Sequence, residues 1–470
     1  MGGLSKKGFQ FNKIASDAKR PHLTLDAGEL LFKQKEITPD QEEQAKLTAA
    51  AIVEAYNLIG YDAVCVGSQD LIAGLPYLKT LSKDAKFAWL SANLINKSTK
   101  KPVVKPSASI QLGRIKAGII GLTGPAILSV TDDAIILPWD QVLPGLIPKM
   151  AKANELLILL SNLPAADNQR IAETYPAIHL IIQSGASANN ISPAPINNTL
   201  IASTGPQGKH VGIMEISWQQ SKRWSDPKTE VLANKKVSLD QLLLELSKYQ
   251  QDKDPETALR NQPDQLKAYH ILRTQEQGLR AEIEQLSQGI NKLAPAKGDP
   301  STYSNRFLAM EAAGPDHPEI SSRLVNLDAA INTLGKRRAE TAAQQASSPY
   351  LGFRGCGACH TPQLASWQKT NHAKAYTTLA QAKQGFNQSC LPCHVTGVDP
   401  SHAADALSVP DDRRGVGCET CHGPGRSHSE NPTANHLTRT PEPKVCLTCH
   451  SAPHDKDFQY DDRIKMVGHQ

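Results

Sequence analysis

The stretch VGCETCHGPGRSH, residues 416–428, contains two cysteines separated by two residues, a histidine directly after the second, and a further histidine at 428. Three other pentads have the same form, namely CGACH at 356–360, CLPCH at 390–394 and CLTCH at 446–450. Together the pentads use eight of the nine cysteines. The remaining one, Cys65, lies in an apolar run, and we expect it to be a buried core residue.

Each pentad has the residues that attach a c-type haem. Two thiols at this spacing can form thioether bonds to the haem vinyl groups, and the adjacent imidazole is then placed against the iron. Zinc sites and disulfides also use paired cysteines, but neither needs a histidine directly after each pair. We therefore predict four haem c groups. The attaching cysteines are Cys356, Cys359, Cys390, Cys393, Cys418, Cys421, Cys446 and Cys449, and the proximal ligands are His360, His394, His422 and His450.

Other histidines in this region are candidates for the second axial position of each iron. His372 falls on a predicted helix after the first pentad, His428 follows a Gly-Pro-Gly loop, and His469 lies at the end of the sequence. His454 is a further candidate, whereas His402 and His436 lie in polar segments and are expected at the surface. If imidazoles held both axial positions of an iron, no position would remain for a substrate, which indicates electron transfer. An iron with one open axial position could bind and react with a ligand.

Hydrophobic periodicity divides the chain into three regions. Residues 1–235 alternate buried-strand patterns, within 22–28, 61–67, 116–122, 155–163 and 177–185, with helical stretches such as 38–60. This pattern predicts an α/β layered domain with a largely parallel core. Residues 348–470 contain few aliphatic residues, and we expect a mostly α-helical or irregular domain whose core the haems fill.

The middle region, residues 236–347, has two apolar stripes with alternating spacings of four and three. One comprises Leu279, Ile283, Leu286, Ile290 and Leu293, and the other Ile320, Leu324, Leu327, Ile331 and Leu334. Such stripes predict an antiparallel helical hairpin, either as a spacer or as a coiled coil through which the protein self-associates.

Charge and hydropathy limit the partners. The 51 Lys and Arg residues nearly balance 46 Asp and Glu, without the basic stripe that nucleic-acid binding requires. No apolar run approaches the roughly 18 residues of a membrane span, and no leader is visible at Met1. Because haem c is attached outside the cytoplasm, we nevertheless expect an exported protein, periplasmic or extracellular. The sequence would then begin at a processed boundary or downstream of the true start.

The C-terminal segments from CGACHTPQLASWQKTNHAKAY to CLTCHSAPHDKDFQYDDRIKMVGH resemble the tetrahaem cytochrome c-554 family. The resemblance runs from about Tyr350 to His469. It implies four covalent haems in closely stacked pairs, with His372, His428 and His469 at positions of distal ligands. It also implies electron transfer between a redox donor and an acceptor, and members of the family can leave one haem without a histidine cap.

The N-terminal segments GGLSKKGFQFNKI, LTLDAGELLF, GYDAVCVGSQDL and LIASTGPQGKHVGIMEI resemble the metallophosphoesterase domain of 5′-nucleotidases, over about residues 2–218. Active members bind two metal ions, and two-metal hydrolysis needs bridging carboxylates and imidazoles. The family's first Asp-x-His strand is absent here. The remaining ligand signatures are replaced by Gly28-Glu29, Gly67-Ser68-Gln69-Asp70, Ser161-Asn162 and Ser184-Gly185-Ala186-Ser187. We therefore expect a non-hydrolytic scaffold, with one weakly bound divalent cation near Glu29 and Asp70 as the minor alternative.

The sequence as a whole favours an exported multihaem electron carrier of anaerobic or inorganic respiration over an enzyme. One alternative is a haem oxidoreductase that acts on a small nitrogen or sulfur species at an uncapped iron. A second is a metal-dependent nucleotidase fused to a cytochrome.

Overall fold

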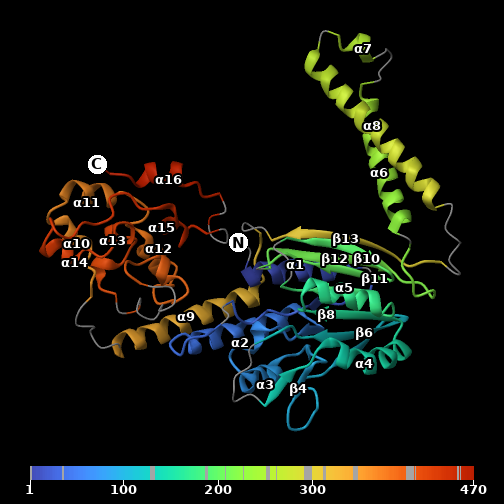
Figure 1. The fold of residues 1–470 in the computed structure, drawn as a ribbon, viewed down its shortest axis with the longest axis horizontal. Helices are drawn as coiled ribbons and strands as arrows, with labels where there is room; N and C mark the ends of the chain where they lie inside the picture. The colour runs from blue at the N-terminus through green and yellow to red at the C-terminus, as the bar shows by residue number, and fades with distance from the viewer. Residues whose placement is uncertain are drawn as a thin grey trace.

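The computed structural model places an α/β domain, a protruding helical hairpin and a C-terminal domain along one chain (Figure 1). It describes residues 3–18, 20–33, 36–126, 133–185, 189–206, 208–225, 227–249, 255–260, 262–290, 299–310, 314–341, 348–398, 407, 409–451, 455, 457–469. No helix in these ranges has both the length and the apolar character needed to cross a bilayer.

Two β-sheets form the centre of the first domain. The smaller has the parallel order β1 (Leu25–Asp26), β2 (Ala63–Cys65), β3 (Ala88–Leu90). The larger has the order β10-β11-β9-β8-β6-β5, with β5 (Ser107–Leu112), β6 (Ile115–Leu122), β8 (Leu156–Ser161), β9 (Leu180–Gln183), β10 (Ile191–Ile196) and β11 (Thr199–Ser203). Its four inner strands are parallel, and its edge strands β5 and β10 are antiparallel. A third pair joins β4 (Leu94–Asn96) to β7 (Ala134–Ile136). The five predicted strand regions are confirmed.

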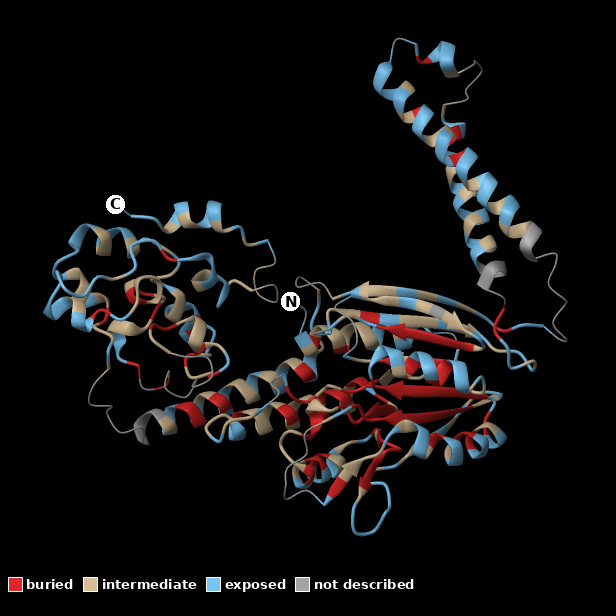
Figure 2. Ribbon diagram, in the orientation of Figure 1, coloured by how far each residue is buried: buried red, intermediate tan, exposed pale blue. Residues whose placement is uncertain are grey.

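The two sheets pack face to face between helical layers. Cys65 and Leu90 of the small sheet meet Ile119 and Ile158 of the large one, and all four are buried. Helices α1 (Gly3–Asp17), α2 (Glu42–Ile59) and α3 (Leu75–Asp84) cover the outer face of the small sheet, while α4 (Trp139–Ala153) and α5 (Ala165–Thr174) cover the large one. Figure 2 shows the buried residues concentrated in these strands. This arrangement confirms the predicted α/β layered class.

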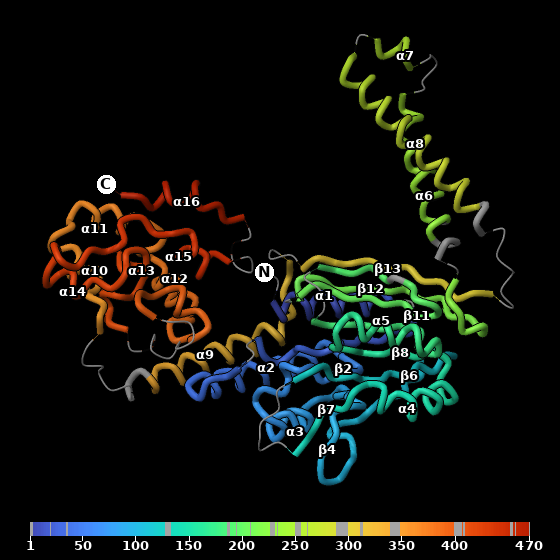
Figure 3. Tube along the Cα trace, viewed as in Figure 1, coloured from blue at the N-terminus to red at the C-terminus, as the bar shows by residue number. Residues whose placement is uncertain are grey.

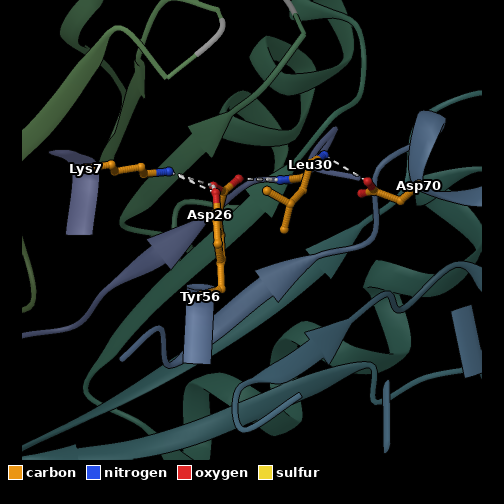
Figure 4. Close-up of polar contacts among 6 residues, drawn as sticks. Lys7, Asp26, Leu30, Tyr56 and Asp70 are labelled. Carbon is orange, nitrogen blue, oxygen red and sulfur yellow. Dashed lines mark hydrogen bonds and ion pairs between the residues drawn. The ribbon is translucent and has the colours of Figure 1, made fainter. Parts of the chain in front are cut away.

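Helix α2 connects β1 to the parallel strand β2 and therefore runs antiparallel to both. It ends at Gly60, whose φ of 84° lets its N–H reach the carbonyl of Tyr56 at 3.0 Å. Tyr56 also donates its hydroxyl to Asp26 of β1 at 2.8 Å, and Lys7 of α1 donates to Tyr56 at 2.9 Å (Figure 4). Helix α1, helix α2 and strand β1 are therefore fixed to one another by a small polar network.

The helical hairpin is inserted between two paired strands. Strands β12 (His210–Ser217) and β13 (Thr302–Ala309) are antiparallel partners, and α6 (Pro227–Ser247), α7 (Pro255–Ala258) and α8 (Pro263–Ile290) lie between them in the chain. Helices α6 and α8 pack together around Leu246, Leu259 and Tyr269. The tube in Figure 3 shows this arm projecting away from the rest of the chain.

The predicted pairing of the two apolar stripes is wrong. The second stripe lies in α9 (Pro318–Thr341), which packs on α1 and α2 and buries Ile320, Ile331 and Leu334, whereas α8 packs on α6. The physical reason is that β13 separates the stripes and its pairing with β12 returns the chain to the first domain before α9 begins.

The C-terminal domain consists of short helices joined by irregular segments. They are α10 (Phe353–Gly357), α11 (Thr361–Trp367), α12 (Ala375–Gln381), η2 (Leu391–Cys393), η4 (Asp411–Arg413), α13 (Cys418–His422), α14 (Arg426–Glu430), α15 (Pro443–Leu447) and α16 (Tyr460–Val467). Among its described residues, one small aliphatic cluster comprises Leu379, Leu391, Val395, Leu407 and Val409. Leu391 of this cluster belongs to the second pentad.

Candidate functional site

Each pentad of the C-terminal domain folds into a single helical or 3₁₀ turn. In the first, the N–H of His360 donates to the carbonyl of Cys356 at 3.0 Å, and in the fourth, His450 donates to Cys446 at 2.9 Å. Residues three and four apart lie on the same face of such a turn. Both thiols and the imidazole of a pentad are thereby directed to one side of the backbone.

Three of the four pentad histidines face a second imidazole. The ring centroids are 6.3 Å apart for His360 and His428, 6.1 Å for His372 and His450, and 5.7 Å for His422 and His469. The first and third pairs are close to parallel, at 22° and 19°, and the second is tilted at 55°. The structure thus brings three of the predicted distal residues to three of the predicted proximal ones.

Hydrogen bonds orient several of these rings. The Nδ1 atoms of His394, His422 and His428 lie 2.7, 2.6 and 2.7 Å from the backbone carbonyls of Ala375, Thr438 and Asn435. The Nδ1 of His450 lies 3.0 Å from the carboxylate of Asp455. A carbonyl or carboxylate can only accept, so Nδ1 is the donor in each contact and Nε2 is the ring nitrogen left to bind a metal.

The three pairs have the separation that a shared metal ion requires. An ion held by one nitrogen of each ring at about 2 Å places the two ring centres about 6 Å apart. Burial lowers the pKa of His372, and the neighbouring His450 lowers it further, which favours the neutral imidazole that a metal needs. The residues present therefore fit iron held between two imidazoles, next to a pair of thiols.

His394, the histidine of the second pentad, differs from the other three pentad histidines. Within the part of the chain that the structure describes, no second imidazole faces its ring. His436 is described and exposed, as expected for a surface residue. His402 and His454 lie outside the described residues.

Thiols from different pentads meet in pairs. The hydrogen bond with Cys356 lowers the pKa of Cys418 to about 7, and the hydrogen bond with Cys393 lowers the pKa of Cys449 to about 6. These contacts join the first pentad to the third and the second to the fourth.

The third pentad also adjoins the fourth. Helix α13, which contains Cys418–His422, contacts α15, which contains Cys446. Burial raises the pKa of Cys421, and the charge of Cys446 contributes to that rise. In space the pentads therefore follow the order first, third, fourth, second.

Sequence reasoning missed Glu419, which lies inside the third pentad and is buried. Its carboxylate accepts the backbone N–H of Leu351 at 2.7 Å, of Gly352 at 2.8 Å and of Gly425 at 2.7 Å. It therefore ties the segment before the first pentad to the loop that leads to His428. A single acidic residue within a pentad gives no sequence signal for this role.

In the first domain, the described positions of the replaced metal ligands converge at the carboxyl ends of β1, β2, β8 and β9; Ala186 and Ser187 lie outside the described residues. Glu29 accepts hydrogen bonds from the side chains of Ser68 and Asn162. Ser184 donates to the carbonyl of Ala27 at 2.9 Å. The convergence agrees with the correspondence inferred from the sequence.

The carboxylates at this edge are occupied by donors of the protein itself. Glu29, at a strained φ of 65°, also accepts the backbone N–H of Ser68 and of Gln69, each at 3.0 Å. Asp70 accepts the backbone N–H of Gly67 at 2.7 Å and of Leu31 at 2.7 Å. It also accepts that of Leu30 at 2.8 Å, the contact shown in Figure 4.

These donors leave the two carboxylates little capacity for a cation. Burial raises the pKa of Asp70 to about 6, with the carboxylate of Glu29 contributing, while the backbone donors oppose that rise. In the described part of this domain, no three His, Cys, Asp or Glu side chains gather as metal ligands would. The residues therefore do not fit a two-metal hydrolytic centre.

Comparison with known proteins agrees with both halves of this description. The family described as "Cytochrome c554 and c-prime" matches residues 355–423. Cytochrome c-554 of Nitrosomonas europaea is 31% identical over 137 residues, which cover 25% of this chain and 57% of that protein. The C-terminal domain is thus similar in sequence to cytochrome c-554.

The first domain is similar to 5′-nucleotidase-type proteins. Protein UshA of Salmonella pullorum is 35% identical over 117 residues, which cover 25% of this chain and 21% of that protein. A 5′-nucleotidase precursor from Thermus thermophilus superposes with a TM-score of 0.45 at 16% identity, over 71% of this chain and 54% of that chain. The chain spans 57% and 21% of the lengths of the two sequence relatives, so neither relative is matched in full.

Proposed function

We propose that this protein is an exported tetrahaem electron-transfer protein. The observation that carries the proposal is the set of three imidazole pairs, each beside a pentad and each at the separation that a bridging iron needs. The eight pentad cysteines would attach the haems, and His360, His394, His422 and His450 would be the proximal ligands.

Three distal ligands follow from the pairs. His428 would complete the site of the first pentad, His469 that of the third and His372 that of the fourth. Haem iron held by two imidazoles supplies one-electron redox chemistry without a position for substrate. The Nδ1 hydrogen bonds to backbone carbonyls and to Asp455 would hold the ring planes and tune the basicity of the Nε2 ligands.

The contacts between pentads support a path for electrons. With haems attached, the neighbouring pentads would give the order first, third, fourth, second, so a donor and an acceptor could dock at the two ends. The partners we propose are therefore redox proteins. Covalent haem attachment supports a periplasmic or extracellular location.

The first domain would act as a scaffold rather than as a hydrolase. Its support is the occupation of Glu29 and Asp70 by N–H donors and the replacement of imidazole ligands by serine and asparagine. The predicted self-association relied on a hairpin of the stripes at 279–293 and 320–334, which do not pair among the described residues, and self-association itself stays a prediction.

A second candidate function is favoured by one observation. His394 faces no imidazole among the described residues, and its pentad lies in the small aliphatic cluster. An iron there with a free position could bind a small ligand such as a nitrogen or sulfur oxide, and the protein would then be a haem oxidoreductase.

Intact mass and absorption spectra test the proposal. Protein produced with haem c maturation is expected to carry four covalent haems and to show low-spin features when ferric and when reduced. Fewer than four haems would contradict the assignment of the pentads. Phosphate release from nucleotides with added manganese, cobalt or zinc would contradict the scaffold role of the first domain.

A further inference from the structure

The segment that leads into the second pentad is held by the first domain. Gln44, near the start of α2, donates to Asn387 Oδ1 at 2.8 Å and to Ser389 Oγ at 3.3 Å. Its own Oε1 accepts the backbone N–H of Gln388 at 3.2 Å. Gln44 is 7% exposed and Gln388 is 4% exposed, so these polar groups are buried between the two domains. Buried polar groups of this kind fix one relative position, because separation would leave them unpaired.

Helix α9 holds the same segment from a second side. Asn332 Oδ1 accepts the backbone N–H of Phe386 at 3.2 Å, and its Nδ2 donates to the carbonyl of Lys383. One turn along, Gly335 lies directly against Phe386. A Cβ at Gly335 would be 2.6 Å from the Cβ and 2.7 Å from the carbonyl oxygen of Phe386. The contact therefore needs a glycine within the helix, at a position where its low helix propensity costs about 1 kcal/mol.

The contact continues into the pentad itself. The N–H groups of Cys390 and Leu391 both donate to the carbonyl of Asn387 at 3.0 Å, so the turn of the pentad starts on the residue that Gln44 holds. Burial and the carboxylate of Asp328 in α9 raise the pKa of Cys390, while Lys33 lowers it. Both charges belong to elements that precede the C-terminal domain, and Lys33 lies four residues after Glu29, on the loop that leads from β1 toward α2.

We propose that the first domain positions the haem of the second pentad, with Gln44, Asn332 and Gly335 as positioning residues. The pentads whose histidines are paired hold their sites with imidazoles from the C-terminal domain itself. The second pentad has no such pair among the described residues and is held instead by α2 and α9. The inference rests on the proposed haem attachment, and it assigns the phosphoesterase-like domain a role toward one of the four sites.

The sharpest test is Gly335→Ala, with Gly278→Ala in α8 as the matched control. Both changes replace a helical glycine by a better helix former, but a Cβ at Gly278 meets no atom within 4 Å. Only Gly335→Ala forces α9 and Phe386 apart. Redox titration of each holoprotein, followed by absorption and EPR spectroscopy, resolves the four midpoint potentials.

The expected result for Gly335→Ala is a lower midpoint potential for one haem, with the other three unchanged. Water entering the loosened contact favours the oxidised, more highly charged iron. Deuterium uptake at residues 383–391 should rise several-fold in the same variant. Gly278→Ala should match the wild type in both measurements. Four unchanged potentials, or a common shift of all four, would overturn the proposal.

Gln44→Glu provides a second test that leaves side-chain size unchanged. The carboxylate keeps an acceptor for the N–H of Gln388 but cannot donate to Asn387 Oδ1. The Asn387 amide cannot rotate to offer its NH2 group instead, because it already donates to Gln384 and accepts from the N–H of Ser389. We expect the same single-haem shift. Intact mass keeps the two proposals apart, since a wild-type protein with fewer than four haems would contradict the proposed function, whereas four haems with unshifted potentials would contradict only the positioning role.

Discussion

Asp455 offers a quantitative test of how the chain tunes one of its sites. Its carboxylate lies 3.0 Å from Nδ1 of His450, and the centre of the His450 ring lies 6.1 Å from that of His372. Across the imidazole, this puts a negative charge about 7 Å from the proposed iron position, where Coulomb's law gives about 2.4 kcal/mol at an effective dielectric constant of about 20. For a one-electron couple this is about 100 mV.

Solvent screening reduces this shift in the midpoint potential. The side chains of His450 and Asp455 are 36% and 26% exposed, so screening should leave roughly half, or about 50 mV. Because a negative charge stabilises the ferric state, Asp455→Asn is expected to raise the midpoint potential of one haem by about 50 mV. The exposed Asp461 supplies the control, since Asp461→Asn removes the same charge without a contact to a histidine.

Spectroelectrochemical titration of both variants measures the effect. The reasoning predicts one shifted component in Asp455→Asn and four unshifted components in Asp461→Asn. A downward shift, or equal shifts in both variants, would refute the assignment of Asp455 as the partner that tunes His450.

Three further predictions concern other residues. His469→Ala should let one additional haem of the reduced protein bind carbon monoxide, whereas His436→Ala, at an exposed position, should leave carbon monoxide uptake unchanged. Glu419→Gln replaces one carboxylate oxygen by an NH2 group, so at least one of the three backbone N–H donors loses its acceptor. The change should lower the stability of the haem domain by about 1–3 kcal/mol in thermal melts followed at the Soret band, with the exposed Glu430→Gln as a neutral control. Burial lowers the pKa of His179 to about 4, so the unfolded chain takes up a proton at a higher pH than the folded one. The stability difference between wild type and His179→Gln should therefore fall by about 3 kcal/mol from pH 7 to pH 4 in urea titrations, and a constant difference would show that the imidazole is not buried in its neutral form.

The sequence predicted the first domain well because its signals are local. All six residues of β8 are buried in a parallel sheet, and such a strand reads as a continuous apolar run. The spacing of each pentad likewise fixes which thiols and imidazole share a turn. Residues that act through their neighbours in sequence can be identified from the sequence alone.

Long-range choices could not be predicted in the same way. The apolar stripe of α9 would fit either α8 or α2, and only the pairing of β12 with β13 decides between them. The sequence predicted candidate distal histidines. It could not predict that His428 pairs with His360 or His469 with His422, because these pairs depend on how the short helices pack. Gln44 gave no signal, since its partners lie more than three hundred residues away, at a separation of 343 for Asn387.

Carbon monoxide titration of the dithionite-reduced protein tests the central claim, the three imidazole pairs, most directly. Two occupied axial positions exclude the ligand, so the account predicts that at most one of the four haems binds carbon monoxide and that at least three keep their low-spin spectrum. Uptake of two or more equivalents per chain would show that at least one of the imidazole pairs does not hold an iron, and would contradict the account.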